Sequence, residues 1–153
     1  MTSMMSLAVC EVLDGRRILL KKETEGMGNG KWVGLSVELD RNSDPAYCAA
    51  TLLKREVGLV APRPLLHGVC NFYKGTAELP FVKAHIFSVK VPGGIGSRSR
   101  GMRWFNLGSI PYDKMWDDDL FWLPLVVNGR RFNGSFVYDR NMKRVVNYRI
   151  SLR

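Results

Sequence analysis

The chain has few cysteines and few histidines, and this scarcity argues against several classes of site. Its 153 residues include 3 cysteines, Cys10, Cys48 and Cys70, which are far apart and form no Cys-x-x-Cys pair. Neither a disulfide framework nor a zinc site is indicated, and we expect reduced, buried thiols. His67 and His85 have no Ser or Cys at a recognisable spacing. A catalytic triad is therefore not expected, and ordinary hydrogen-bonded histidines are favoured.

Long apolar runs and linkers are also missing. No apolar run approaches about 18 residues, the length that a membrane-spanning helix needs. The start, MTSMMSLAVCEVLDG, has no basic segment and reaches Glu11 and Asp14 too early for a signal peptide. No Pro/Gly/Ser stretch is long enough to divide a chain that is 46% hydrophobic. We expect one domain over residues 1–153, no membrane partner, and a cytoplasmic or nuclear location.

Acidic residues are scarce relative to basic ones. Lys and Arg number 23 against 14 Asp and Glu, a net charge of +9. Such an excess favours anionic partners such as nucleotides, polyphosphates or nucleic acid. The alternative is a basic surface that serves only solubility.

Apolar, strand-forming runs separated by turn residues make up most of the chain. A β-hairpin over residues 6–13 and 16–22 is expected, because Asp14-Gly15 suits a tight turn. The other predicted strands cover residues 32–39, 65–73, 81–91 and 102–107, with a closing hairpin over 132–139 and 143–152.

Two segments have helical patterns. The first follows Pro45, which suits a first turn, with Ser43 or Asp44 as its cap and Gly58 as its left-handed end. The second lies within residues 110–127, where Pro124 should limit or bend it. Strands surrounding two helices indicate an α+β or α/β class with a mixed sheet.

The strand order and the Glu-x-Gly-Leu at the end of the first helix resemble the Nudix family. Its signature is G-x5-E-x7-R-E-U-x-E-E-x-G-U, where U is aliphatic, and it forms a loop, a helix and a loop. The end of the signature matches at Leu53, Glu56, Gly58 and Leu59, whereas Val37, Ser43, Thr51, Leu52 and Arg55 replace its other fixed residues. The resemblance implies a Nudix fold, an α/β/α sandwich around a mixed β-sheet, with a degenerate catalytic helix.

The replaced residues bear on metal binding. Positions 52, 55 and 56 share one helical face, where the family holds divalent cations with carboxylate oxygens. Here that face carries Leu52, Arg55 and Glu56. This is a poor magnesium site, because Arg55 adds repulsion and the cation needs several oxygen ligands. If the chain is active, Glu56 is the catalytic carboxylate and binds Mg²⁺ or Mn²⁺ with Glu38 or Asp40; otherwise no cofactor is expected.

A wider likeness, over nearly the whole chain, is to the oxidised-purine nucleoside triphosphatases of this family. It implies that Trp116 stacks on a purine and that Asp118 and Asp119 bond to the base edge, one as an acid and one as a carboxylate. The alternative is that these aspartates only cap a helix and Trp116 fills the core. Other base-pocket positions fall on Phe72 and Met102, which match the relative's pocket but have strand core as their alternative role. Met27 takes the place of a pocket Phe, and Val33, Glu23 and Gly101 also depart from that pocket.

Three hypotheses follow. In the first, the chain is a pseudoenzyme that binds a nucleotide or nucleotide-like molecule, with Arg55 and Lys21 or Lys22 on the phosphate oxygens. In the second, it is a metal-dependent hydrolase that releases a nucleoside monophosphate and pyrophosphate.

In the third hypothesis, the fold is a platform for RNA or protein, bound through a basic late segment with interleaved aromatic residues. The alternative is a solvated face over an aromatic core. The segment comprises Arg98, Arg100, Arg130, Arg131, Arg140, Lys143, Arg144 and Arg149, with Phe132, Phe136, Tyr138 and Tyr148 between them.

Overall fold

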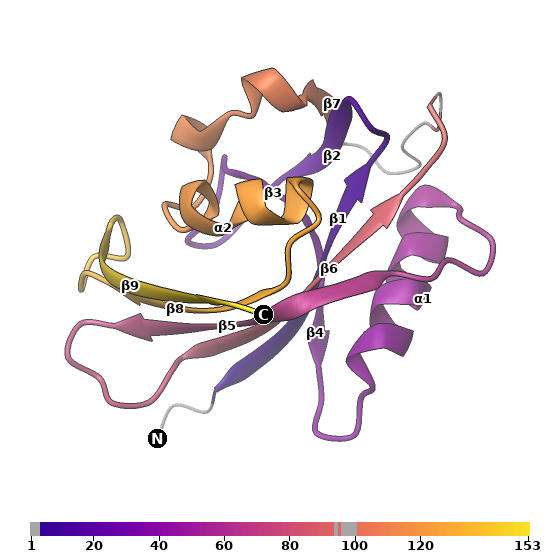
Figure 1. The fold of residues 1–153 in the computed structure, drawn as a ribbon. Helices are drawn as coiled ribbons and strands as arrows, with labels where there is room; N and C mark the ends of the chain where they lie inside the picture. The colour runs from indigo at the N-terminus through magenta and orange to yellow at the C-terminus, as the bar shows by residue number, and fades with distance from the viewer. Residues whose placement is uncertain (1–3, 94, 96–100) are drawn as a thin grey trace.

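A mixed β-sheet with a helix on each face forms the fold (Figure 1). This computed structural model describes residues 4–93, 95 and 101–153. The main sheet order is β3-β2-β1-β6-β5-β8-β9, and β4 and β7 pair with β1 and β2. β1 runs parallel to β6 and β5 runs parallel to β8, whereas the other pairs are antiparallel. The described strands are β1 Met5–Leu13, β2 Arg17–Lys22, β3 Trp32–Val33, β4 Leu35–Leu39, β5 Leu65–Lys74, β6 Val82–Lys90, β7 Met102–Asn106, β8 Phe132–Tyr138 and β9 Val145–Leu152.

The prediction of one continuous strand over residues 32–39 is wrong at Gly34. The segment divides there into β3, which pairs with β2, and β4, which pairs with β1. A Cβ atom at Gly34 would overlap the carboxylate of Glu11. The break thus lies where the backbone passes a buried acidic side chain.

Helix α1 (Pro45–Val57) confirms the predicted helix and its end. Gly58 has φ 80° and its N–H donates to the carbonyl oxygens of Leu53 and Lys54, as a left-handed terminal residue does. The predicted side-chain cap is wrong. Asp44 makes no capping hydrogen bond among the described residues, and the Ser43 hydroxyl donates to Asp40 instead.

Helix α2 (Asp119–Val127) lies within residues 110–127 and confirms the second predicted helix. Two short 3-10 turns, η1 (Leu107–Ser109) and η2 (Tyr112–Lys114), lie before it. Pro124 is inside α2 and removes one backbone donor, and the helix ends three residues later.

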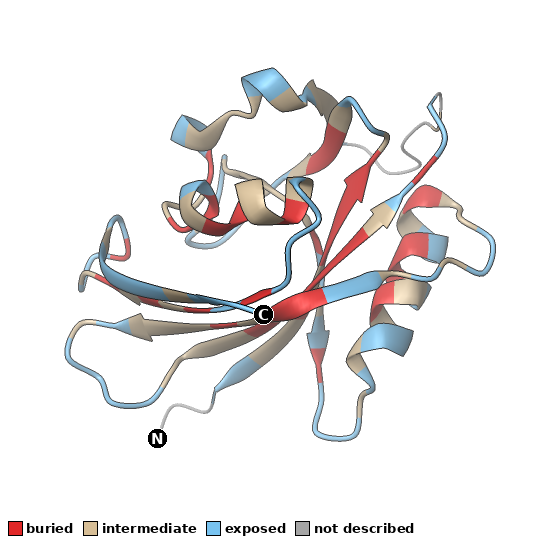
Figure 2. Cartoon of the chain, in the orientation of Figure 1, coloured by how far each residue is buried: buried red, intermediate tan, exposed pale blue. Residues whose placement is uncertain are grey.

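The two faces of the sheet bury separate apolar clusters. On β1, Ala8, Cys10 and Val12 pack toward α1, whereas Leu7 and Val9 face the side covered by α2, as the two-residue period of a strand requires. Figure 2 shows the buried residues on the sheet and on the sides of both helices that face it.

The prediction of buried thiols is confirmed for Cys10 and Cys70 and wrong for Cys48, and the prediction of a hydrogen-bonded histidine is confirmed for His67. Cys10 and Cys70 are free and buried, and Cys48 is free but half-buried. His67 is buried, and its ring nitrogens lie 2.7 Å from the Arg130 carbonyl oxygen and 2.6 Å from the Ser88 hydroxyl. No helix among the described residues has the length and apolar character to cross a membrane.

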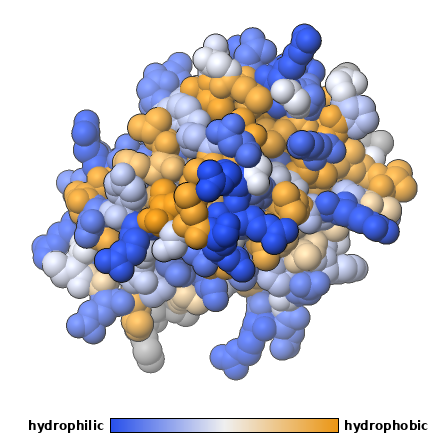
Figure 3. All heavy atoms as spheres, viewed as in Figure 1, coloured by the Kyte–Doolittle hydropathy of each residue, from blue (hydrophilic) through white to orange (hydrophobic). Residues whose placement is uncertain are grey.

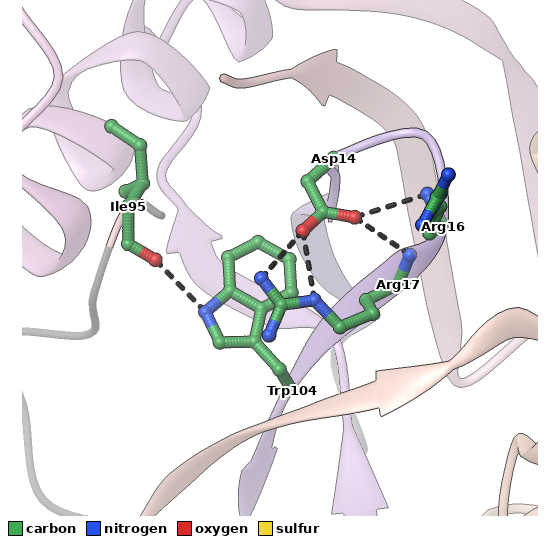
Figure 4. Close-up of polar contacts among 5 residues, drawn as sticks. All are labelled: Asp14, Arg16, Arg17, Ile95 and Trp104. Carbon is green, nitrogen blue, oxygen red and sulfur yellow. Dashed lines mark hydrogen bonds and ion pairs between the residues drawn. The ribbon is translucent and has the colours of Figure 1, made fainter. Parts of the chain in front are cut away.

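The turn between β1 and β2 is held by Asp14 (Figure 4). Its carboxylate accepts the backbone N–H groups of Arg16 and Arg17 at 3.0 and 2.7 Å, and it pairs with the Arg17 guanidinium at 2.8 Å. That guanidinium lies 4.8 Å from the ring centre of Trp104, whose indole N–H donates to the Ile95 carbonyl oxygen. The turn therefore also anchors β7.

We expect Gly58→Ala to lower the free energy of unfolding by about 1 to 2 kcal/mol, because a side chain strains the left-handed conformation. Denaturant unfolding measures the change. Gly108→Ala is the control, since Gly108 has no positive φ and open space around its Cα. Equal losses in the two variants would contradict the role of the left-handed helix end.

Candidate binding site

A cavity of about 490 Å³ opens between the sheet and the segment that leads into α2. Strands far apart in the sequence contribute to it, because β1, β5, β6 and β8 are neighbours in the sheet. Its walls include Leu7, Val9, Glu11, Glu23, Gly28, Val33, Gly34, Phe72, Ala84, Ile86, Trp116, Asp118, Asp119, Trp122, Tyr138 and Met142.

The structure brings four of the predicted base-pocket residues together, namely Phe72, Trp116, Asp118 and Asp119. Met27 and Met102 do not line this cavity. Met27 is 70% exposed in the turn before β3, and its neighbour Gly28 lies against the Trp116 ring instead. Met102 is in β7 and packs with the cluster on the α1 face.

Trp116 forms a half-buried aromatic wall of the cavity. The ammonium group of Lys31 lies 5.1 Å from its ring centre, and the Tyr138 ring meets it edge-on at 6.1 Å. A flat, half-buried indole offers a stacking surface for a planar ring. Its exposure and its place in the cavity wall argue against a purely core role.

Asp118 is buried and accepts hydrogen bonds from two aromatic side chains. The Trp122 indole N–H donates to its Oδ2 at 2.7 Å, the Tyr138 hydroxyl donates to its Oδ1, and the Asp118 backbone N–H donates to the Tyr138 oxygen at 3.0 Å. Burial raises the pKa of Asp118, and these donors oppose that rise. The contacts favour the carboxylate form.

Asp119, the first residue of α2, is buried beside Asp118. Burial is the main cause that raises its pKa well above the usual range, and the charges of Asp118 and Glu11 raise it further. Asp119 therefore retains its proton more readily than Asp118. The pair offers an acid beside a carboxylate, although burial contributes more than the mutual repulsion that the sequence suggested.

The capping interpretation fails for Asp118, whereas Asp119 lies in the first turn of α2, where a carboxyl group can interact favourably with the positive end of the helix. Asp117 accepts the backbone N–H of Val145 at 2.7 Å and so joins the start of α2 to β9. Asp118, at the N-cap position, makes no side-chain capping bond among the described residues. Asp117 and Asp118 thus fix the start of α2 against β9 and Tyr138.

Glu11 is a cavity residue that the sequence reasoning missed. It is 1% exposed, and burial raises its pKa to about 8. Its Oε2 has no hydrogen-bond partner among the described residues. The sequence contained one signal for this residue, because Glu11 is a single acidic residue on the strand face that also carries Leu7 and Val9.

The proposed metal ligands do not come together. Glu56 lies 3.8 Å from the Lys21 ammonium and 4.0 Å from Arg55 Nε, so its carboxylate faces two cations. Asp40 accepts from Ser43 and Asn42 in an exposed turn, and Glu38 is exposed on β4. No group of three acidic, His or Cys side chains is placed to hold a metal ion in the described part of the chain. This donor set does not fit a divalent cation.

The predicted phosphate-binding residues lie mainly near Glu56. Arg55 is 61% exposed and Lys21 is 39% exposed, on the α1 side of the sheet. Lys22 is exposed, and its ammonium group lies 5.8 Å from the ring centre of Trp32. An anion at Arg55 and Lys21 would therefore compete with Glu56 for the same cations.

The late basic segment has exposed charges but mostly buried aromatic rings. Phe132, Phe136 and Tyr138 belong to the core, whereas Tyr148 is 50% exposed. The buried rings have no free face for stacking on bases, so the interleaving reflects a solvated strand face over core. In the view of Figure 3, hydrophilic and apolar side chains are interspersed. Arg98 and Arg100 lie outside the described residues.

We expect stability to fall as pH rises from about 4.5 to 8, because folded Glu11 keeps a proton that the unfolded chain releases. The contribution is at most about 1.4 kcal/mol per pH unit. Glu11→Gln should remove this dependence. The free energy of unfolding of the variant, measured with denaturant, should therefore rise relative to that of the wild type as the pH approaches 8. Glu38→Gln, at an exposed carboxylate, is the control. Parallel pH profiles for wild type and Glu11→Gln would contradict this assignment.

No protein-family model matches the chain. Two curated relatives do: the oxidized purine nucleoside triphosphate hydrolases of Danio rerio and of Mus musculus. The first is 32% identical over 136 residues, which cover 87% of this chain and 86% of the relative. The second is 32% identical over 131 residues, which cover 84% of this chain and 83% of the relative.

A solved structure also matches nearly the whole chain. The MutT protein of Bacillus halodurans superposes with a TM-score of 0.76 at 16% identity, covering 97% of this chain and 98% of that one. At this identity the match concerns the fold, and it confirms the predicted mixed α/β architecture. Together with the curated relatives, it shows that the chain belongs to the Nudix family, close to the oxidized purine nucleoside triphosphate hydrolases.

Proposed function

We propose that the chain binds a nucleotide or nucleotide-like molecule, with its base in the cavity, and hydrolyses it weakly or not at all. The observation that carries the proposal is the buried pair Asp118 and Asp119 beside the indole of Trp116 in one cavity. A planar base would stack on the indole while an N–H of its edge donates to Asp118 and an acceptor receives the proton of Asp119.

The electrostatics around Glu56 support weak hydrolysis. Metal-dependent cleavage of a polyphosphate needs cations held by several oxygen ligands. Lys21 and Arg55 surround the Glu56 carboxylate instead, and a divalent cation would be repelled by both. Lys21 and Arg55 carry two positive charges against the one negative charge of Glu56, so a phosphate group could form charge-assisted hydrogen bonds with them in competition with Glu56.

An active hydrolase is the competing function, and the 32% identity to two curated triphosphate hydrolases favours it. In that case Glu56 would be the essential carboxylate. The two functions predict opposite effects of substitutions on the α1 face and the same effects in the cavity. Separate experiments on the two regions therefore distinguish them.

Base binding is tested without metal. We expect purine nucleotides to raise the melting temperature of the wild type and Trp116→Ala to raise the dissociation constant about 5- to 150-fold, because stacking contributes about 1 to 3 kcal/mol. Trp116→Phe, which keeps an aromatic ring, should retain most of the affinity. If no nucleotide shifts the melting temperature, or if Trp116→Ala binds as tightly as the wild type, the proposed binding of the base in the cavity is refuted.

Hydrolysis is tested by pyrophosphate release with Mg²⁺ and with Mn²⁺. We expect a low rate that Glu56→Gln does not change. Arg55→Glu should raise both metal affinity and rate, because it removes a repulsive charge and adds an oxygen ligand, and one such contributor commonly changes the rate about 100-fold. Lys54→Glu is the control, with the same charge change at the adjacent exposed position. Wild-type turnover that Glu56→Gln abolishes would establish the competing function.

A further inference from the structure

Glu11 is an acidic residue in the apolar wall of the cavity that no contact within the described chain explains. It lies near the end of β1, on the strand face that also carries Leu7 and Val9. Its side chain lines the cavity, is 1% exposed, and has an Oε2 atom without a hydrogen-bond partner among the described residues. A buried polar atom with no partner lowers stability.

The neighbouring backbone leaves room for this carboxyl group. Gly34 separates β3 from β4, and a Cβ atom there would overlap both Glu11 oxygens. A leucine at position 11 would satisfy the apolar surroundings without such a gap. The two residues together form a polar recess in the cavity, in which Glu11 Oε2 has no hydrogen-bond partner among the described residues.

The charges around the recess are mostly acidic. Asp119 from α2 lies close enough for the charge of Glu11 to affect it, and the Tyr112 hydroxyl, from η2, is affected as well. Lys31 is the cation that acts on Asp119, from its place over the Trp116 ring. No salt bridge to Glu11 exists among the described residues. A ligand that supplies N–H donors would complete this environment.

We propose that Glu11 is a specificity-determining residue that accepts an N–H from the bound base, in addition to the contacts of Asp118 and Asp119. The ligand is then a nitrogen heterocycle with donors at two places on its ring system, such as an exocyclic amino group or a protonated ring nitrogen beyond the edge that the aspartates contact. This inference rests on the proposed binding of a base in the cavity.

Matched nucleotide pairs test the inference. Dissociation constants are measured without metal, from Trp fluorescence, for guanosine against inosine triphosphate, 2,6-diaminopurine against adenine nucleotide, and 7-methylguanosine against guanosine triphosphate. We expect the wild type to prefer the member with the extra donor or positive charge at least about tenfold in one or more pairs. Glu11→Leu should abolish that preference, and Glu11→Gln, which keeps an acceptor oxygen, should retain part of it.

The outcomes separate the inference from the function on which it rests. If the wild type binds none of these nucleotides, both the proposed binding of a base in the cavity and the role of Glu11 are overturned. If the wild type binds and Glu11→Leu and Glu11→Gln keep all the preferences, only the role of Glu11 is overturned. The melting temperature without ligand is the independent readout. We expect Glu11→Leu to raise it, and a lowered value in both variants would assign Glu11 to folding instead of recognition.

Discussion

The hydrogen bonds of Asp118 are the interaction on which the cavity depends. Its carboxylate joins the Tyr138 hydroxyl, at the end of β8, to the Trp122 indole, inside α2. Asp117 adds a bond to the backbone of Val145 in β9. These contacts fix the start of α2 against the closing hairpin, and Asp119, the next residue, is thereby held in the cavity at a place where water does not solvate it.

The strands and the first helix were predictable because they depend on local pattern. Apolar, strand-favouring runs specify β1 and β2, and Gly58 specifies the end of α1. The division of the segment 32–39 at Gly34 and the contacts at the start of α2 were not predictable in the same way. The division at Gly34 lies where the backbone passes Glu11, a residue on another strand, and the hydrogen bond from Tyr138 to Asp118 joins the start of α2 to β8. Both are tertiary effects that no sequence window contains.

The candidate site was predictable only where a resemblance supplied it. Trp116, Asp118 and Asp119 line the cavity as the resemblance implies, but Met102 belongs to the other face because β7 pairs with β2 in a register that turns it toward α1. Glu11 could have been noticed from strand period alone. A single carboxyl group among apolar residues on one strand face is costly unless something binds it.

Carboxyl groups are distributed unevenly between the two faces of the sheet, and this bears on function. Beneath α2, Glu11, Asp118 and Asp119 remain buried, where each costs free energy of solvation. On α1, Leu52 is buried in the apolar cluster, whereas Arg55 is 61% exposed beside Glu56, where solvent access would make a carboxylate inexpensive. Burial of three carboxyl groups lowers stability, so packing alone does not account for them. The buried acids therefore support the proposed ligand in the cavity, and Arg55 beside Glu56 supports the proposed weak hydrolysis.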